Sequence, residues 1–111
     1  MEFIAEHTSY YNNNNMVALY FHARWMDNSM NKKYITMISK VESSFNDIKF
    51  YAINTDDFKN LCKIYNITAI PTVVILKKGK EISRINGMPL TAAFKKVFAD
   101  ICMSDTLNIG A

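Results

Sequence analysis

The sequence predicts an α/β fold in which a central mixed β-sheet is flanked by helices on both faces. Two observations lead to this prediction. Short apolar runs of strand length alternate along the chain with segments whose apolar residues recur at helical spacing. The last two apolar runs are separated only by the turn sequence KKGK, which indicates an antiparallel hairpin at one edge of the sheet. With 111 residues, 50% of them hydrophobic, the chain is long enough to bury one core.

The first strand is expected at residues 16–22 (MVALYFH), a continuous apolar run typical of a strand buried on both faces. Asp27, Asn28 and Ser29 follow, and each is a preferred residue at the N-cap of a helix. Apolar residues then recur at helical spacing, with polar residues between them. They are Met30, Tyr34, Met37, Ile38, Val41 and Phe45. This segment predicts an amphipathic helix of about four turns.

The remaining elements follow from the same two periodicities. KFYAIN at residues 49–54 predicts a second strand, and apolar residues on one face of residues 58–65 predict a short helix. TVVILK at residues 72–77 is a β-branched strand, and EISRIN at residues 81–86 alternates as the strand that returns from the hairpin. Residues 90–101 predict a last helix with one apolar face.

The composition of the chain changes near both ends. Residues 1–15 are expected to be a polar lead, because they end in the low-complexity run NNNN. They lack the basic start and apolar segment of a signal peptide. Residues 16–103 are expected to form one domain, and residues 104–111 a C-terminal tail.

Several function classes are disfavoured by composition. The net charge of +3 is small and the lysines are spread along the chain, so nucleic-acid binding is not expected. No apolar run approaches the ~20 residues of a membrane helix, so no membrane partner is expected. Cys62 and Cys102 form no CxxC pair and have no His at metal-ligand spacing, so we expect no metal site and no cofactor. A reducing compartment fits this cysteine usage, and a cytoplasmic monomer is favoured.

Four stretches of the chain carry a resemblance to a known family. They are YFHARWMDNS, INTDD, YNITAIPTVVILKKGK and ING, in this order along the sequence. The first holds Trp25, and the third holds the Ile-Pro-Thr sequence that contains Pro71. Their order and spacing resemble those of the thioredoxin family over nearly all of residues 16–101. The resemblance implies the thioredoxin fold, with a cis peptide bond before Pro71.

The departures from the family pattern concern its redox chemistry. By the resemblance, the two active cysteines fall on Met26 and Ser29, the buried acid on Tyr20, and its basic partner on Ala52. A thiolate is needed to attack a disulfide and a second thiol to resolve the product. A thioether cannot ionise, and a serine hydroxyl is too weakly acidic to replace a thiol. The resemblance therefore implies a scaffold without the redox-active cysteine pair, and thioredoxin-type disulfide reductase activity is not expected at this site.

The same resemblance implies a groove that binds an extended segment of a partner protein by strand addition. The expected groove residues are Trp25, Met26, Ile70, Pro71, Gly87 and Met88. The cis bond before Pro71 would place the Ile70 backbone where a partner chain can pair with it. Trp25 would offer a large apolar surface, and Met26 and Met88 flexible, polarisable ones. A non-catalytic protein- or peptide-binding module is the predicted function.

Two alternatives stay open. The stretch NLCKIYNITAIPT is similar to phosducin-like chaperonin cofactors, which are also thioredoxin folds with degraded active sites. The second alternative is a thiol-disulfide oxidoreductase that acts through Cys62 or Cys102 in cell redox homeostasis. Cys62 is expected to be buried in the core and Cys102 half-buried at the end of the last helix. The resemblance places their helices on opposite faces of the sheet, so both are expected to be free thiols.

Overall fold

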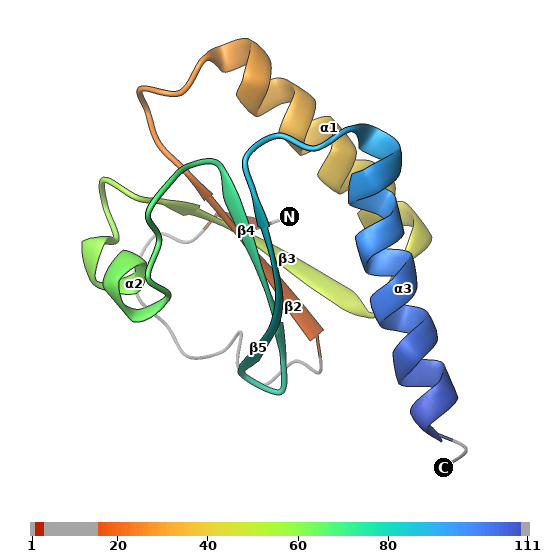
Figure 1. The fold of residues 1–111 in the computed structure, drawn as a ribbon. Coiled ribbons are helices and arrows are strands. Elements are labelled where there is room, and N and C mark those ends of the chain that lie inside the picture. The colour runs from red at the N-terminus through yellow and green to blue at the C-terminus, as the bar shows by residue number, and fades with distance from the viewer. Residues whose placement is uncertain (1, 4–15, 110–111) are drawn as a thin grey trace.

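The computed structural model describes residues 2–3 and 16–109. Strands and helices alternate along the chain as the sequence predicts (Figure 1). The elements are β1 (Glu2–Phe3), β2 (Met16–His22), α1 (Asn28–Ser44), β3 (Ile48–Asn54), α2 (Lys59–Ile64), β4 (Thr72–Lys77), β5 (Lys80–Asn86) and α3 (Thr91–Ile109).

The strands form one mixed sheet in the order β1-β3-β2-β4-β5. β3 pairs in parallel with both β1 and β2, whereas β4 pairs antiparallel with β2 and with β5. Lys78 and Gly79 connect β4 to β5, and both have positive φ angles, 52° and 80°. Two consecutive residues in the left-handed region form the tight turn that matches the twist of a hairpin. The predicted hairpin at the edge of the sheet is confirmed.

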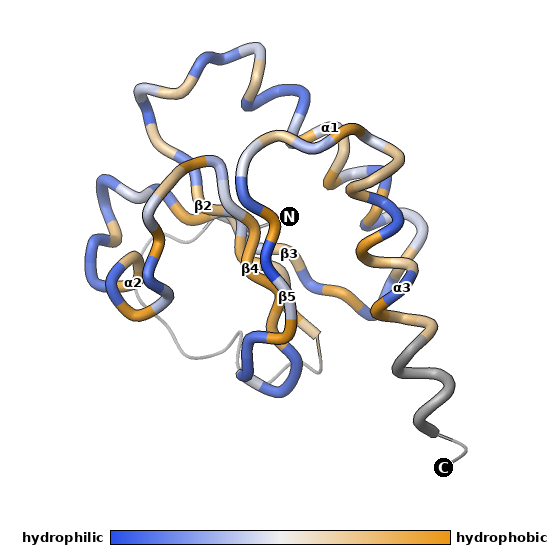
Figure 2. Tube along the Cα trace, in the orientation of Figure 1, coloured by the Kyte–Doolittle hydropathy of each residue, from blue (hydrophilic) through white to orange (hydrophobic). Residues whose placement is uncertain are grey.

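The helices cover both faces of the sheet, which confirms the predicted layers (Figure 1). Met16, Ala18 and Tyr20 of β2 face α1 and α3, because alternate residues of a strand point to opposite sides. Val17 and Leu19 of the same strand pack toward α2. Figure 2 shows that hydrophobic residues concentrate along the central strands, whereas polar residues occupy the hairpin turn. β2 is therefore buried on both faces, as its continuous apolar run predicts.

The boundaries of some elements differ from the predicted ones. β3 begins at Ile48 and β5 at Lys80, one residue earlier than predicted. α3 runs from Thr91 to Ile109, so the helix extends into the segment 104–111 that is predicted as a tail. The polar lead also contains a short strand, Glu2–Phe3, which extends the sheet beside β3. Residues 4–15 of the predicted lead lie outside the described residues.

An aromatic cluster joins the two long helices to the sheet. Tyr34 of α1 stacks on Tyr20 with ring centroids 4.8 Å apart and meets the edge of Phe94 at 5.5 Å. The ring centroid of Phe98 lies 5.1 Å from that of Phe94 and 5.4 Å from that of Phe50 of β3. All five side chains are fully buried. Because aromatic side chains bury the largest apolar areas, this cluster holds α1 and α3 against β2 and β3.

Candidate functional site

Met26, which the resemblance places at the first of the family's two cysteine positions, is buried rather than presented at the surface. Its side chain is 7% exposed. The Ala23 N–H donates a hydrogen bond of 3.4 Å to the Met26 Sδ, and the Met26 N–H donates to the Ala23 carbonyl at 3.2 Å. The thioether of Met26 therefore closes the loop between β2 and α1, and it leaves little surface for the contact with a partner that the sequence predicts.

Asp27 caps the N-terminus of α1, as predicted. Its carboxylate oxygen Oδ1 accepts a hydrogen bond of 2.7 Å from the Ser29 N–H. This bond satisfies one of the helix N–H groups that have no partner within the helix. Ser29, which the resemblance places at the second cysteine position, lies exposed in the first turn of α1. The segment that carries the family's thiol chemistry by resemblance thus holds a buried thioether and an exposed hydroxyl.

Tyr20 and Ala52 are neighbours in the register of β2 and β3, and the resemblance places the family's buried acid and its partner at these positions. The Tyr20 hydroxyl donates a hydrogen bond of 2.7 Å to the Asn31 Oδ1 in the first turns of α1. Burial raises the pKa of Tyr20 to about 12, so the phenol is neutral at physiological pH. A neutral, hydrogen-bonded phenol here avoids the cost of a buried carboxylate without a partner.

A chain of contacts joins two loops and α1 around Pro71. The Ile70–Pro71 peptide bond is cis. The Gly87 N–H donates a hydrogen bond of 2.8 Å to the Pro71 carbonyl, and the Tyr34 hydroxyl donates one of 3.2 Å to the Gly87 carbonyl. Gly87 has a φ of 78°, a conformation that side chains disfavour. Tyr34 fixes the Gly87 loop, a role that helical periodicity alone cannot reveal because it predicts only that Tyr34 is buried.

The six predicted groove residues differ in exposure. Trp25 is 72% exposed and Met88 is 38% exposed, whereas Ile70 and Gly87 are half-buried. The ring of Pro71 is buried. Like Met26, Pro71 can shape the loop but offers little side-chain surface to a partner. Trp25, Ile70 and Met88 remain as the side chains able to touch a bound chain.

Trp25 and Ile70 line one shallow hollow of about 340 Å³, which we call the Trp25 hollow. It is also lined by Thr55, Cys62, Ile67, Thr68 and Ala69. Met88 lies outside it and lines a different hollow, beside α1. The predicted set is therefore not gathered in one cavity. The sequence does not predict residues 67–69 as part of the site, because they belong to no periodic element. They directly precede the Ile-Pro-Thr sequence, which is the signal that could have indicated them.

Ile70 also presents unpaired backbone at this place. Among the described residues, neither its N–H nor its carbonyl has a hydrogen-bond partner. The ladder between β4 and β5 begins only at Thr72. The Thr72 hydroxyl meanwhile donates a hydrogen bond of 2.6 Å to the Ala69 carbonyl, which fixes the turn before Pro71. An unpaired N–H and carbonyl beside an apolar hollow are the groups that an added strand uses.

Cys62 lies at the Trp25 hollow and Cys102 on the opposite side of the sheet. Neither cysteine forms a disulfide, as predicted, and the two pack against different core clusters. Cys62 is half-buried, so its prediction as a fully buried core residue is wrong in part. Burial raises the pKa of the Cys62 thiol, and the charge of Asp56 raises it further. A raised pKa reduces the fraction of thiolate, the nucleophilic form.

Charged groups surround the loop that carries Trp25. The Arg24 guanidinium contacts the Asp57 carboxylate at 3.1 Å, and the Arg24 N–H donates to an Asp56 carboxylate oxygen at 3.3 Å. Both pairs connect the β2–α1 loop to the segment after β3. Burial lowers the pKa of His22, and the carboxylates of Asp56 and Asp57 oppose this shift. Exposed pairs of this kind contribute little stability, so their effect is mainly to position the loop beside Trp25.

The structure also bears on metal binding and on membrane insertion. Within residues 2–3 and 16–109, no group of His, Cys, Asp or Glu side chains is arranged to hold a metal ion. No helix in the described part of the chain is long and apolar enough to span a membrane.

Comparisons with known proteins identify the family. A family model for Thioredoxin matches residues 4–100 of the chain. Thioredoxin H2 of Arabidopsis thaliana is 40% identical over 60 residues, which cover 54% of this chain and 45% of that protein. Thioredoxin-2 of Saccharomyces cerevisiae is 29% identical over 84 residues, which cover 76% of this chain and 78% of that protein. In Thioredoxin H2 and two other curated relatives, the matched part of the chain spans about half the length of the relative.

The fold agrees with that of solved thioredoxins. The solution structure of oxidised thioredoxin from Plasmodium falciparum matches with a TM-score of 0.80 at 18% identity. The match covers 90% of this chain and 96% of that chain. This likeness shows the fold alone. Together with the family model, which extends over most of the sequence, it confirms the predicted fold class: the chain belongs to the thioredoxin family.

Proposed function

We propose that this thioredoxin-family chain is a redox-inactive module that binds an extended segment of a partner protein at the Trp25 hollow. The backbone of Ile70 pairs with the partner chain by strand addition. The side chains of Trp25 and Ile70 contact its apolar residues. The buried side chains of Met26 and Pro71 hold the loop between β2 and α1 and the loop before β4 in place.

The exposed Trp25 beside the unpaired Ile70 backbone is the observation that carries this proposal. A tryptophan 72% exposed to solvent gains apolar contact when a partner covers it. The Ile70 N–H and carbonyl lack partners among the described residues, so a bound strand supplies hydrogen bonds where water now competes. Backbone pairing gives affinity without sequence preference, whereas the hollow selects the side chain that enters it.

The side chains at positions 26 and 29 support the redox-inactive part of the proposal. Met26 is a buried thioether, and Ser29 is an exposed hydroxyl in the first turn of α1. Neither can form the mixed disulfide that thioredoxin chemistry requires. The raised pKa of Cys62 weighs against the oxidoreductase alternative, since little thiolate is present at neutral pH. The phosducin-like alternative stays a hypothesis, because nothing in the described residues separates it from other binding modules.

Selection of linear peptides displayed on phage tests the binding part. We expect selected peptides to lose about tenfold in affinity for the Trp25→Ala variant, because a central aromatic anchor typically contributes this much or more. Ile64→Ala is the matched control, since Ile64 is 65% exposed on α2 but lies outside the hollow. The Ile70 amide should also become protected from hydrogen exchange in the complex. Peptides whose affinity depends equally on Ile64 and Trp25, or a selection without enrichment, would contradict the proposal.

Insulin reduction by dithiothreitol tests the redox part. The protein is compared with a cysteine-containing thioredoxin and with the Cys62→Ser/Cys102→Ser double variant. We expect no acceleration over dithiothreitol alone. Acceleration that disappears in the double variant would instead establish the oxidoreductase alternative, with one of these cysteines as its nucleophile.

A further inference from the structure

A second concave surface lies on the other side of the sheet, along the seam between α1 and α3. A hollow of about 400 Å³ opens between the first half of α1 and the loop before α3. A second hollow, of about 390 Å³, follows toward the end of α1. Both are lined by Met37, Lys40 and Thr91, so they form one continuous groove, which we call the α1–α3 groove. Neither hollow shares a lining residue with the Trp25 hollow.

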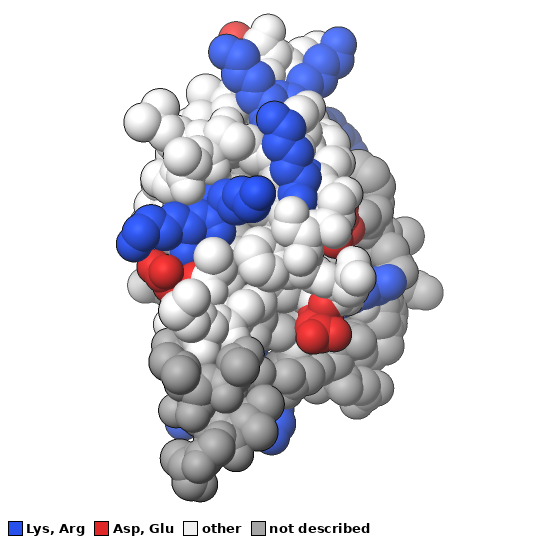
Figure 3. Space-filling view, turned by 90° about the vertical axis from the view of Figure 1, so that its right-hand side faces the viewer, with Lys and Arg blue, Asp and Glu red and all other residues white. Residues whose placement is uncertain are grey.

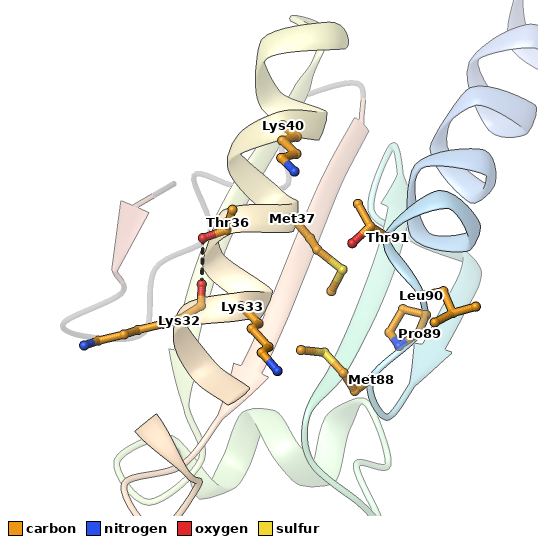
Figure 4. Close-up of a pocket in the computed structure, with 9 residues that line it drawn as sticks. All are labelled: Lys32, Lys33, Thr36, Met37, Lys40, Met88, Pro89, Leu90 and Thr91. Carbon is orange, nitrogen blue, oxygen red and sulfur yellow. Dashed lines mark hydrogen bonds between the residues drawn. The ribbon is translucent and has the colours of Figure 1, made fainter. Parts of the chain in front are cut away.

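The floor of the α1–α3 groove is apolar. Met37 is 5% exposed and Phe94 is 1% exposed at its base. Figure 4 shows the side chains of Met37 and Met88 pointing toward each other across the groove. Leu90, at the start of α3, is 81% exposed at its edge. Methionine side chains adapt to varied apolar shapes, so this floor can accept an aliphatic or aromatic side chain.

The rim of the groove carries lysines without balancing acids. Lys33, Lys40 and Lys95 line it, and no Asp or Glu among the described residues does. No ion pair joins these three lysines to another described residue. In Figure 4 the amines of Lys33 and Lys40 are directed toward the groove, whereas Lys32 points away. Figure 3, which views the side of the molecule where α3 lies, shows Lys and Arg side chains gathered over the upper half of that face.

We propose that the α1–α3 groove binds an acidic peptide segment that inserts an apolar side chain between Met37 and Met88. The lysines on the rim pair with the carboxylates of the segment, and the apolar floor takes its central side chain. From Lys33 to Ser44 the helix spans about 16 Å at 1.5 Å per residue. An extended segment of about five residues covers that length. Charge complementarity makes the acidic class of segment the matching one, because a basic segment would meet only like charges here.

Fluorescence anisotropy tests this proposal with a labelled linear peptide in which Asp and Glu flank a Leu–Phe pair. A copy with Asn and Gln in place of the acids is the control peptide. We expect the acidic peptide to bind and the neutral copy to bind at least about tenfold more weakly. The Lys33→Glu/Lys40→Glu double variant should bind the acidic peptide at least about tenfold more weakly, since the substitutions convert attraction to repulsion. Leu90→Ala should weaken both peptides while leaving the preference for acids unchanged.

Lys59→Glu/Lys63→Glu is the matched control variant. It makes the same change in net charge on α2, across the sheet from the groove, and at physiological salt its charges are screened within about 8 Å. The control should therefore keep the affinity of the parent, as should Trp25→Ala, which tests the Trp25 hollow separately. All four lysines are exposed, so both double variants should fold.

Four results would overturn the proposal. The first is an equal loss of affinity in the two double variants, and the second is equal binding of the acidic and neutral peptides. The third is no binding of the acidic peptide up to about 1 mM. The fourth is binding of the protein to phosphatidylserine vesicles without binding to the peptide. The last result would assign the lysines to a lipid surface. None of them bears on the Trp25 hollow, so the two proposals fail independently.

Discussion

At the scale of single residues, Met26 shows how a position can retain a structural role when it lacks a reactive group. Its sulfur accepts a hydrogen bond from the Ala23 N–H, and its side chain fills the space beneath the loop. Ser29, three residues later, has an exposed side chain, and its N–H donates to the Asp27 carboxylate. The two positions therefore have opposite environments, although the resemblance pairs them as the sites of one disulfide.

The Met26→Cys/Ser29→Cys double variant should gain measurable insulin reduction above dithiothreitol alone. It restores a thiol pair at CxxC spacing beside a helix N-terminus, where thiol pKa values are lowered. The activity should stay below that of a thioredoxin, because the Asp27 carboxylate opposes thiolate formation and a tyrosine, Tyr20, stands where the resemblance places the family's buried acid.

The single variant Met26→Cys is the control for this prediction. It lacks a resolving thiol and should form mixed disulfides without turnover. A double variant that forms its disulfide but reduces no insulin would show that these two positions are not sufficient to restore the chemistry on this scaffold.

His22 gives a pH dependence to stability. Burial lowers its pKa in the folded protein, so the unfolded chain binds a proton more readily. Stability should therefore be fully present above the unfolded value of about 6.5 and fall as the pH decreases toward the folded pKa. We expect a higher urea midpoint at about pH 7.5 than at about pH 5.5, and a smaller difference in His22→Gln. An unchanged pH dependence in the variant would assign the effect to other groups.

At the scale of elements, Arg84 connects β5 to the segment that carries Ile70. Its guanidinium donates to the backbone carbonyls of Tyr65 and Asn66, just after α2, and also to the Glu81 carboxylate at 2.8 Å. The hydrogen bond that Arg84 donates lowers the pKa of Glu81. The loop of the Trp25 hollow is thus held from the edge strand as well as through Thr72.

Arg84→Ala should destabilise the protein by about 1–2 kcal/mol, because two backbone carbonyls and a carboxylate lose a charged donor. Arg84→Lys should recover only part of this loss, since one ammonium cannot reproduce the planar array of donors. Urea unfolding measures both. Hydrogen exchange at the Ile67 amide, which donates to the Cys62 carbonyl at 2.8 Å, should accelerate in Arg84→Ala. If stability falls but that exchange rate does not change, Arg84 stabilises the fold without ordering the hollow.

At the scale of the whole molecule, the long helices depend on one aromatic cluster rather than on surface charges. Phe98 of α3 contacts Phe94 on its own helix and Phe50 on the sheet, and all three are fully buried. The ion pair of Lys96 with Asp100 is exposed on the same helix. Pairs of that kind typically contribute less than about 1 kcal/mol. The position of α3, and with it one wall of the α1–α3 groove, is therefore set by apolar packing.

Phe98→Ala should cost about 3–5 kcal/mol of unfolding free energy, because it leaves a cavity between α3 and β3. Met103→Ala on the same helix should change stability by less than about 0.5 kcal/mol, since Met103 is 64% exposed. Denaturant titration followed by circular dichroism measures both variants. Similar losses in the two would mean that α3 is held along its length and not by this cluster.

Much of the fold could be predicted because its elements follow local periodicity. The continuous apolar run of β2, the helical spacing of α1 and the turn at Lys78–Gly79 each depend on neighbouring residues alone. The site was predicted less completely. Trp25 and Ile70 were identified through the resemblance, but the burial of Met26 and Pro71 depends on side chains from other elements.

The amino-acid sequence by itself determined the order of strands and helices, the N-cap at Asp27 and the residue types at positions 26 and 29, because these are local or directly written in the chain. Only the tertiary structure decided that Trp25 and Ile70 share one hollow with Cys62, that Tyr34 holds the Gly87 loop, and that Met88 belongs to a different groove. These relations join residues far apart in the sequence. Their side chains meet through packing across the sheet, which no local pattern specifies.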